Sequence, residues 1–472
     1  MSKLAAKYII LGMGPTGIGA ALRLLELGIK DFLIIDKQSD AGGLSSSVVD
    51  ENGFTWDFGG HVQFSHYQKF DEAMDLALGK DGYFHHQRES WVYLKDRFVP
   101  YPFQYNLHRL PQEDQNKALA GLEDIQGLPV DKTNFQTFLE SSFGSGICDV
   151  FLSPYNFKVW AHPPSLMSCQ WTAERVAPVS LDKVKNNLKE QQDQVSWGPN
   201  HTFKFPKEGG TGAIWKSLAK NIPTAHLRMG QTVTSIDVAQ KSLLLENGER
   251  YTYEKLISTI PINLLAQYMK DTELSAQTDG LLFSATHIIG IGLEGQPPKD
   301  LKTKCWMYFP EDNCPFYRVT VFSNYSPNNT PRPGRTWSLM AEVSESEHKP
   351  VDSKRILENV IEGMYNTRLI SADDLIISQF HKRLEQGYPI PGLQRDHIIE
   401  QALPYLEKFD IFSRGRFGAW KYEVSNQDHS FMQGVEVVER LVHGNEERTL
   451  NFPNEVNKQH NPFPYTEWKS PP

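Results

Sequence analysis

A glycine-rich turn near the start of the chain constrains the fold more than any other stretch. The apolar run from Tyr8 to Leu11 is typical of a buried parallel strand, and it ends abruptly at glycine. Gly12, Gly14 and Gly17 follow at the spacing of a dinucleotide-binding turn. Their missing side chains permit a tight turn, close approach of the backbone to a pyrophosphate, and close packing of a helix on the strand. The spacing therefore predicts a unit that binds a dinucleotide.

The residues after the turn complete this unit. Leucines between Leu22 and Leu27 predict a helix whose N-terminus directs partial positive charge at the phosphates. A second apolar run, Phe32 to Ile35, ends in Asp36. A carboxylate at the tip of that strand is placed to accept hydrogen bonds from a ribose 2′-hydroxyl. Strand, turn, helix, strand and acid all fall within about 30 residues, which distinguishes a dinucleotide site from an ordinary turn.

A second glycine pair indicates which dinucleotide is bound. The stretch Ala41-Gly42-Gly43-Leu44-Ser45-Ser46 follows Asp36 closely. It resembles flavoproteins related to glutathione reductase and amine oxidases, in which the glycines let the backbone pass beside the FAD pyrophosphate. The resemblance implies bound FAD rather than a diffusible NAD. A plain loop is the alternative explanation of Gly42 and Gly43.

Length, composition and charge exclude several classes of protein. The chain has 472 residues, of which 39% are hydrophobic and 22% charged, so we expect a globular protein of two or three domains. No apolar run reaches the ~18 residues that a membrane-spanning helix needs, and no signal-peptide core precedes the first strand. The net charge of −9 argues against nucleic acid or an anionic membrane as the main partner.

The cysteines and histidines indicate a compartment rather than a metal site. Four cysteines and fifteen histidines show no metal-binding spacing, so we expect no metal. The cysteines are most simply the reduced thiols of a cytoplasmic protein.

Hydrophobic periodicity divides the chain into three units of an α/β protein. We expect a discontinuous Rossmann-like FAD-binding domain, a helical insert domain that carries a mobile substrate loop, and an antiparallel β-sheet domain. The bounds are, in that order, residues 1–88, 203–278 and 400–472; residues 106–200; and residues 89–105 with 279–399.

Several local predictions follow from turn and helix signals. Short strands between Thr232 and Ser258, with a turn at Asn247-Gly248, predict an antiparallel ribbon that returns to the parallel sheet. Gly387-Tyr388-Pro389 is interpreted as a turn. A helix is expected from Asn426 to Leu441, followed by an extended tail beyond Asn445.

A resemblance to a more specific family rests on long, uncommon strings. The stretch Gly59-Gly60-His61-Val62-Gln63-Phe64-Ser65-His66-Tyr67 is similar to the segment that lies against the flavin ring in eukaryotic UDP-galactopyranose mutases. The similarity runs nearly end to end. Further matching strings are Pro154 to Trp160, Phe309 to Arg318, Ser323 to Pro327, Arg414 to Gly418 and Asn426 to Ser430.

The resemblance implies an isomerase without net redox change. The family interconverts UDP-galactopyranose and UDP-galactofuranose. N5 of reduced FAD attacks the galactose anomeric carbon, which gives a flavin–sugar adduct and an iminium before ring contraction. The reductant is a nicotinamide dinucleotide, NADPH or NADH. The resemblance leaves the oligomeric state open.

The resemblance also assigns site residues. The catalytic set is His61, Arg175 and Arg318, with the arginines placed to hold the pyrophosphate. The FAD-binding set is Gly12, Gly14, Gly17, Asp36, Gly42, Gly43, Ser45, Gly60, His61, Val233, Arg416, Asn426, Gln427 and Ser430. The substrate-binding set is Phe64, Tyr101, Phe103, Gln104, Asn156, Trp160, Arg175, Asn200, Trp306, Tyr308, Arg318, Tyr388, Tyr422 and Asn426.

Two hypotheses concern motion at this site. Rotation of the Gly60–His61 peptide would let a carbonyl accept the N5–H that appears on flavin reduction, so the backbone of His61 matters more than its imidazole. The loop from Arg175 to Asn200 closes over the UDP-sugar and excludes water.

Two other functions share the same FAD half. A redox flavoenzyme of the amine oxidase or desaturase kind would need an apolar or amine-fitted pocket instead of one for phosphate. A non-enzymatic relative of the Rab GDP-dissociation inhibitors would lack bound flavin, and Asp36, Gly42, Gly43 and Arg416 argue against it.

Overall fold

The first apolar run forms the central strand of a seven-stranded sheet. The computed structural model describes residues 4–172, 179–195 and 201–464. Strand β1 (Leu4–Leu11) pairs in parallel with β2 (Phe32–Asp36) and with β12 (Arg250–Ser258). Strands β9 (Leu227–Met229) and β18 (Ile411–Ser413) add further parallel pairs to β2 and β12. This parallel core confirms the predicted βαβ unit.

The predicted antiparallel ribbon is also present in this sheet. Strand β10 (Val233–Asp237) pairs with β11 (Ser242–Leu245), and β11 pairs with the first residues of β12. The last residues of β12 return to the parallel sheet beside β1.

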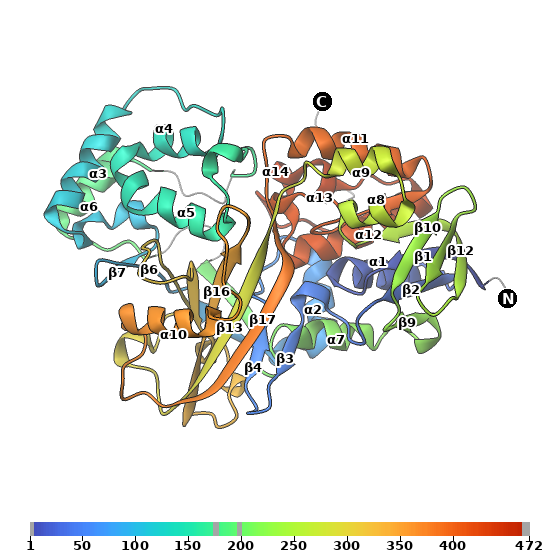
Figure 1. The fold of residues 1–472 in the computed structure, drawn as a ribbon, viewed down its shortest axis with the longest axis horizontal. Coiled ribbons are helices and arrows are strands. Elements are labelled where there is room, and N and C mark those ends of the chain that lie inside the picture. The colour runs from blue at the N-terminus through green and yellow to red at the C-terminus, as the bar shows by residue number, and fades with distance from the viewer. Residues whose placement is uncertain (1–3, 173–178, 196–200, 465–472) are drawn as a thin grey trace.

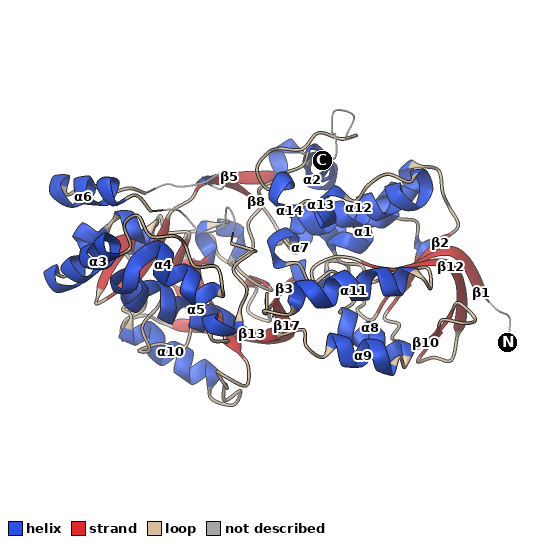
Figure 2. Cartoon of the chain, turned by 90° about the horizontal axis from the view of Figure 1, so that it is seen from above, coloured by secondary structure: helices blue, strands red, loops and turns tan. Residues whose placement is uncertain are grey.

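Helices cover both faces of the sheet. Figure 2 shows α1 (Pro15–Glu26) and α12 (Gln427–His443) on one side, with α8 (Ile262–Met269) and α9 (Thr272–Thr278) on the other. Helices α1 and α12 touch backbone to backbone: a Cβ on Gly434 would lie 1.9 Å from the Thr16 carbonyl oxygen. The N-terminus of α12 is thereby fixed relative to the glycine turn.

A second seven-stranded sheet forms the middle of the molecule (Figure 1). Its strand order is β17-β13-β16-β15-β14-β6-β7, and all neighbours are antiparallel except β14 and β6. Its apolar side packs on α10 (Ile356–Asn366). The strands are β6 (Ser90–Leu94), β7 (Arg97–Pro100), β13 (Phe283–Glu294), β14 (Trp306–Tyr308), β15 (Arg318–Val321), β16 (Thr336–Glu345) and β17 (Ile376–Pro389).

A group of helices forms the third unit, at the upper left of Figure 1. It contains α3 (Gln112–Asp124), α4 (Phe135–Ile147), α5 (Ser153–Trp160) and α6 (Leu181–Glu190). Helices α3 and α4 approach closely, because a Cβ on Gly146 would lie 2.2 Å from the Lys117 carbonyl oxygen. Helix α6 lies within the loop predicted from Arg175 to Asn200, of which the structure describes residues 179–195. Asn187 of this helix donates to the Tyr105 carbonyl at 2.9 Å.

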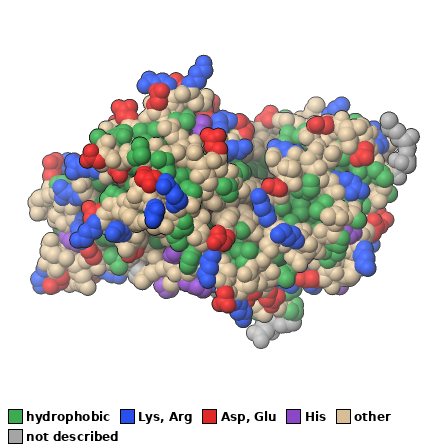
Figure 3. Space-filling view, turned by 90° about the horizontal axis from the view of Figure 1, so that it is seen from below, with side chains coloured by type: hydrophobic (Ala, Val, Ile, Leu, Met, Phe, Trp, Pro, Cys, Tyr) green, Lys and Arg blue, Asp and Glu red, His purple; other side chains and the backbone are tan. Residues whose placement is uncertain are grey.

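Smaller elements join the three units. The residue bounds of the three units stay a prediction. They are α2 (Gln68–Leu78), α7 (Gly212–Ala219), α11 (Arg395–Glu407), β3 (Ser47–Val49), β4 (Thr55–Asp57), β5 (Tyr83–Gln87) and β8 (Thr202–Pro206). On the face seen in Figure 3, acidic and basic side chains are interspersed. Among the described helices, none combines the length and apolar character needed to cross a bilayer.

Two local predictions are wrong. Gly387 to Pro389 is the end of β17 and not a turn; the register against β13 shifts there, and a Cβ on Gly387 would lie 2.1 Å from the Thr286 hydroxyl. The glycine therefore serves a bulge that brings two strands close. The chain beyond Asn445 is not simply extended, because it forms α13 (Arg448–Asn451) and α14 (Pro453–Val456).

Candidate active site

One large cavity lies where the three units meet. Its volume is about 1540 Å³, larger than the roughly 300–1,000 Å³ of a pocket for one small ligand. The wall includes the β1–α1 turn, the loop Gly59–His66, helix α5, the end of β17 and the N-terminus of α12. The cavity therefore has room for a dinucleotide and a second ligand.

The dinucleotide end of the cavity is a cradle of backbone. Gly12 has φ +101°, and a Cβ there would lie 2.1 Å from the Thr259 hydroxyl. A Cβ on Gly17 would lie 1.9 Å from the Gly12 carbonyl oxygen, so α1 can approach β1 only without a side chain. Gly42 and Gly43 have φ +122° and +54°. Together with the N-terminus of α1, this cradle fits the pyrophosphate of FAD.

Asp36 stands at the rim of the cradle, as the sequence predicts. Its carboxylate accepts the N–H of Met13 at 2.6 Å and the N–H of Gln38 at 2.7 Å. Burial raises the pKa of Asp36, and the two backbone donors counteract this effect. The side chain is thus fixed at the end of β2, on the cavity wall.

At the opposite end, Arg318 is held by a carboxylate that the sequence analysis missed. Glu342 is 1% exposed and accepts from Nε and Nη2 of Arg318, each at 2.8 Å. It also accepts from the Tyr317 hydroxyl at 2.6 Å and from the N–H of Gly60 at 3.0 Å. The signal that could have revealed Glu342 is an acidic residue inside an apolar strand, because such residues are rarely buried without a partner.

The ion pair determines the charge of both groups. Burial acts to raise the pKa of Glu342, but the Arg318 charge and the three donors lower it overall. Burial acts to lower the pKa of Arg318, and the Glu342 charge raises it well above its ordinary value. The guanidinium uses only part of its donor fork on Glu342, so it retains donors for an anion in the cavity.

His61 lies near Glu342, Arg318 and Arg416, and its imidazole is neutral. Burial and the neighbouring charges of Arg416 and Arg318 outweigh Glu342 and lower the pKa of His61 to about 4. No described protein group accepts from or donates to its buried Nδ1. A polar atom left unpaired on a cavity wall fits a ligand that supplies the missing partner.

Aromatic rings form the rest of this end. The Trp160 ring lies 4.8 Å from that of Tyr422 and 5.7 Å from that of Tyr388. Tyr308 contacts the rings of Tyr101 at 5.6 Å and Tyr155 at 5.2 Å. Tyr155 is a second wall residue that was not predicted from the sequence, although it lies within the matching string around α5.

Arg416 connects the two ends of the cavity. Its Nη2 donates to the Gly387 carbonyl at 3.0 Å and its Nη1 to the Ser425 hydroxyl at 2.9 Å. Its guanidinium lies 5.1 Å from the centre of the Tyr388 ring. Arg416 therefore links the bulge in β17 to the segment just before α12.

Most residues proposed from the sequence line the cavity. From the cofactor set these are Gly12, Gly14, Asp36, Gly43, Ser45, Gly60, His61, Val233, Arg416, Asn426, Gln427 and Ser430. From the substrate set they are Phe64, Tyr101, Asn156, Trp160, Trp306, Tyr308, Arg318, Tyr388 and Tyr422, together with Asn426. Arg175 and Asn200 lie outside the described residues.

Four proposed residues do not reach the cavity wall. Gly17 and Gly42 lie directly behind the cradle, where they permit its shape. Phe103 and Gln104 are 0% and 5% exposed, and Phe103 packs on Phe151 with ring centres 4.7 Å apart. The roles of Phe103 and Gln104 in binding substrate stay a prediction.

Comparisons with known proteins agree with this geometry. Residues 15–383 match the family "Flavin containing amine oxidoreductase". A crystal structure of reduced UDP-galactopyranose mutase is 47% identical, with a TM-score of 0.94, and the match covers 97% of this chain and 98% of that one.

Two more distant structures share the fold. A putative protoporphyrinogen oxidase from Exiguobacterium sp. 255-15 is 15% identical over 93% of this chain and 99% of that one, with a TM-score of 0.70. A fatty acid isomerase from P. acnes is 13% identical over the same shares, with a TM-score of 0.63. Of these three structures, only the mutase combines high sequence identity with coverage of almost the full length. The chain therefore belongs to the UDP-galactopyranose mutase family, within the flavin-containing amine oxidoreductases.

Proposed function

We propose that this protein interconverts UDP-galactopyranose and UDP-galactofuranose with FAD bound in the cavity. One observation carries the proposal: a single cavity joins a backbone cradle for a dinucleotide to an arginine and a set of tyrosines suited to a second phosphate ligand. An amine oxidase would need an apolar or amine-fitted pocket instead. The 47% identity to a mutase supports the same conclusion.

The cofactor fits the residues present. Gly12, Gly14 and Gly43 would lie against the pyrophosphate, and Asp36 would accept from a ribose hydroxyl. Reduced FAD, when bound, supplies the nucleophile for the anomeric carbon of galactose. The N-terminus of α12, with Asn426 and Gln427, supplies positive partial charge at the cavity wall.

The protein stabilises the leaving pyrophosphate. Negative charge grows on that group as its bond to the sugar breaks, and Arg318 is already placed on the wall by Glu342. Because Glu342 fixes the guanidinium before substrate arrives, little reorganisation is needed during the reaction. Tyr388 and Tyr422 would add hydroxyl donors without adding charge.

The uridine end would lie along α5. Trp160 and Asn156 both line the cavity, and Trp160 would contact the base with its ring. The amide of Asn156 donates to the Leu152 carbonyl at 2.8 Å. Arg175 and Asn200 complete the proposed substrate set, and closure of their loop would exclude water from the reacting sugar.

Three further features belong to the proposal. NADPH or NADH reduces the flavin, by entering the same cleft before the UDP-sugar. The protein is of the eukaryotic type, which is supported by the strings around His61 and Asp428. A cytoplasmic location is supported by four free cysteines, all buried.

The activity test is conversion of UDP-galactofuranose to UDP-galactopyranose, followed by chromatography. We expect turnover with reduced FAD and none with oxidised FAD, with no reductant consumed per cycle. A flavin-loaded protein without turnover in either state would contradict the mutase and favour a redox substrate. Consumption of one reductant per product would contradict the nucleophilic role of the flavin.

A further inference from the structure

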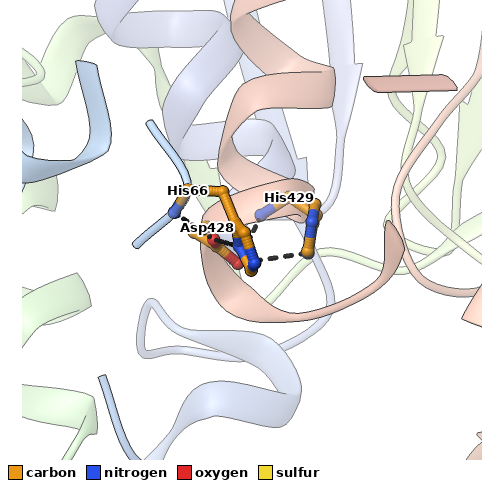
Figure 4. Close-up of side chains that lie close together, drawn as sticks. All are labelled: His66, Asp428 and His429. Carbon is orange, nitrogen blue, oxygen red and sulfur yellow. Dashed lines mark hydrogen bonds and ion pairs between the residues drawn. The ribbon is translucent and has the colours of Figure 1, made fainter. Parts of the chain in front are cut away.

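Two buried side chains and one half-buried side chain meet where the loop Gly59–His66 contacts the first turn of α12 (Figure 4). Asp428 is 1% exposed and His429 0%, and both belong to α12, whereas His66 belongs to the loop. One nitrogen or oxygen atom from each lies within 4.8 Å of the others. His66 and Asp428 also line the cavity. The cluster therefore joins two parts of the cavity wall that are 362 residues apart in the chain.

Asp428 is the centre of this cluster. Its Oδ2 accepts the N–H of His66 at 3.0 Å and lies 2.7 Å from the Nδ1 of the same residue. Its Oδ1 accepts the N–H of His429 at 2.8 Å and lies 3.2 Å from that residue's Nδ1. Each oxygen thus faces two protein nitrogens, which matches its two lone pairs. The two backbone N–H groups and the ring nitrogen of His66 already engage the carboxylate, so the cluster is a hydrogen-bonded hub.

The hub keeps the Asp428 side chain ionised at the cavity wall. Burial acts to raise the pKa of Asp428, but the imidazoles of His429 and His66 hold it well below its ordinary value. The N-terminus of α12 adds positive partial charge beside the carboxylate. The charged group stands next to Asn426 and Gln427, which are expected to contact the cofactor.

The loop is fixed at both ends by carboxylates from different units. The N–H of Gly60 donates to Glu342 of β16 at 3.0 Å, and the N–H of His66 donates to Asp428 of α12 at 3.0 Å. The carbonyl of His66 also accepts from the N–H of Asn461 at 2.6 Å. His61 lies between these anchors. Release of either anchor should therefore loosen the peptide that faces the cavity.

We propose that Asp428 is a positioning residue: through His66 it fastens the loop Gly59–His66 to α12, and its negative charge lowers the reduction potential of bound FAD. The inference rests on the proposed function, because it takes FAD to be the molecule in the cavity. It assigns to Asp428 and His66 a role in setting how readily the active, reduced state forms. A negative charge near the flavin disfavours the addition of electrons, and the effect is strong where water is excluded.

The test compares two substitutions that release the loop but change the charge differently. Asp428→Asn removes the charge and turns an amide donor toward the donors of His66. His66→Phe removes the imidazole donor and leaves the carboxylate less compensated. Glu436→Gln is the matched control, because Glu436 is a buried acid on the same helix that accepts from Thr449 and is not part of the cavity wall.

Two measurements are made on the holoenzymes: amide hydrogen exchange of a peptide containing residues 59–67, and the midpoint potential against a reference dye. We expect both loop variants to exchange at least tenfold faster than the wild type. The ratio of oxidised to reduced flavin at fixed potential should fall about tenfold in Asp428→Asn, a positive shift of about 30 mV, and should rise in His66→Phe. Glu436→Gln should change neither quantity. Exchange is repeated on apoprotein, where the loop effect should persist.

Opposite shifts of the potential separate this role from a merely structural one, because a general loosening would move both variants in the same direction. Equal shifts, unchanged loop exchange, or a stoichiometric metal ion found in the purified protein would overturn the inference. If Asp428→Asn does not fold, a negative shift in His66→Phe supports it and no shift contradicts it. Failure of the wild type to isomerise UDP-galactofuranose would reject the proposed function while leaving the two potentials as an independent result.

Discussion

The dinucleotide end and the aromatic end of the cavity differ in which atoms form the wall. At the dinucleotide end, backbone segments of the β1–α1 turn and of Gly42 and Gly43 pack directly on one another, and added side chains would prevent this packing. At the second, Arg318, Glu342 and a set of aromatic rings come from strands and helices far apart in the chain. The two ends should therefore respond to mutation by different rules: the dinucleotide end to the presence of any Cβ, the aromatic end to the chemistry of a side chain.

The largest effect is expected at Gly17. In Gly17→Ala the new Cβ would lie 1.9 Å from the Gly12 carbonyl oxygen, so α1 must move away from β1. We expect purified protein without flavin, measured as the ratio of flavin to protein absorbance, and a loss of stability above ~3 kcal/mol. Gly127→Ala is the control, because Gly127 has open space around it; unlike Gly17 it has positive φ (+78°), so the control carries backbone strain without a clash. Normal flavin content in Gly17→Ala would contradict the rule for the first end.

Gly60 tests whether the rule for backbone extends into the second end. A Cβ on Gly60 would lie 2.9 Å from Oε1 of Glu342 and 3.3 Å from Cζ of Arg318. Gly60→Val should therefore disturb both the peptide that faces the cavity and the ion pair. We expect FAD to remain bound while retention of the reduced state and turnover fall by at least tenfold, followed by anaerobic absorbance and product formation. Unchanged activity would reject the hypothesis about the Gly60–His61 peptide.

Arg318 tests the rule for side-chain chemistry. Arg318→Met keeps much of the volume but removes the donors for phosphate, and we expect kcat/KM to fall about 100-fold or more with flavin content unchanged. Breaking a buried ion pair also costs ~3–5 kcal/mol, because Glu342 is left without its partner. The double variant Arg318→Met/Glu342→Gln should recover much of the stability and none of the activity. Recovery of activity as well would show that Arg318 acts only through folding.

The same contrast explains what could be predicted from sequence. The first end is encoded within one contiguous stretch, so the spacing of Gly12, Gly14 and Gly17 was sufficient to predict strand, turn and helix, and the structure confirms them. The turn proposed at Gly387 was wrong because local signals do not distinguish a turn glycine from one that lets β17 approach β13. Glu342 was missed because its partners, Arg318 and Gly60, are known only once β15 pairs with β16 and the loop Gly59–His66 lies against that sheet.

The residues of the second end were found only through the resemblance to known mutases. Composition and periodicity would place Trp160, Tyr388 and Tyr422 in a core, and they do pack on one another. Their position on a cavity wall depends on how α5, β17 and the segment before α12 meet. No local pattern contains that information, so a family match or a structure is needed.

His61 gives a smaller effect, on stability rather than turnover. Its folded-state pKa of about 4 lies below the ordinary 6.5, so the unfolded chain binds the proton first as pH falls. The stability that depends on neutral His61 is thus fully present above pH 6.5 and is lost as pH falls toward 4, by ~3 kcal/mol in total. His61→Gln should flatten this dependence in denaturant unfolding of apoprotein between pH 7 and pH 4. Equal slopes in both proteins would contradict a buried neutral imidazole.

The smallest effect is expected at Phe103, and it decides how far the second end extends. Phe103 is fully buried and packs on the cavity residue Phe151, whose ring centre lies 4.7 Å from its own. Phe103→Leu keeps an apolar side chain and leaves a small void, which should cost ~1 kcal/mol and lower the Tm by a few degrees. If the cavity wall defines the substrate site, KM for the UDP-sugar should change by less than about threefold, because a packing residue behind the wall alters binding only indirectly. A KM raised tenfold or more, with flavin content and kcat retained, would instead place Phe103 in contact with the nucleotide. The aromatic end would then rearrange when substrate binds, whereas the dinucleotide end, built from backbone, has no comparable freedom.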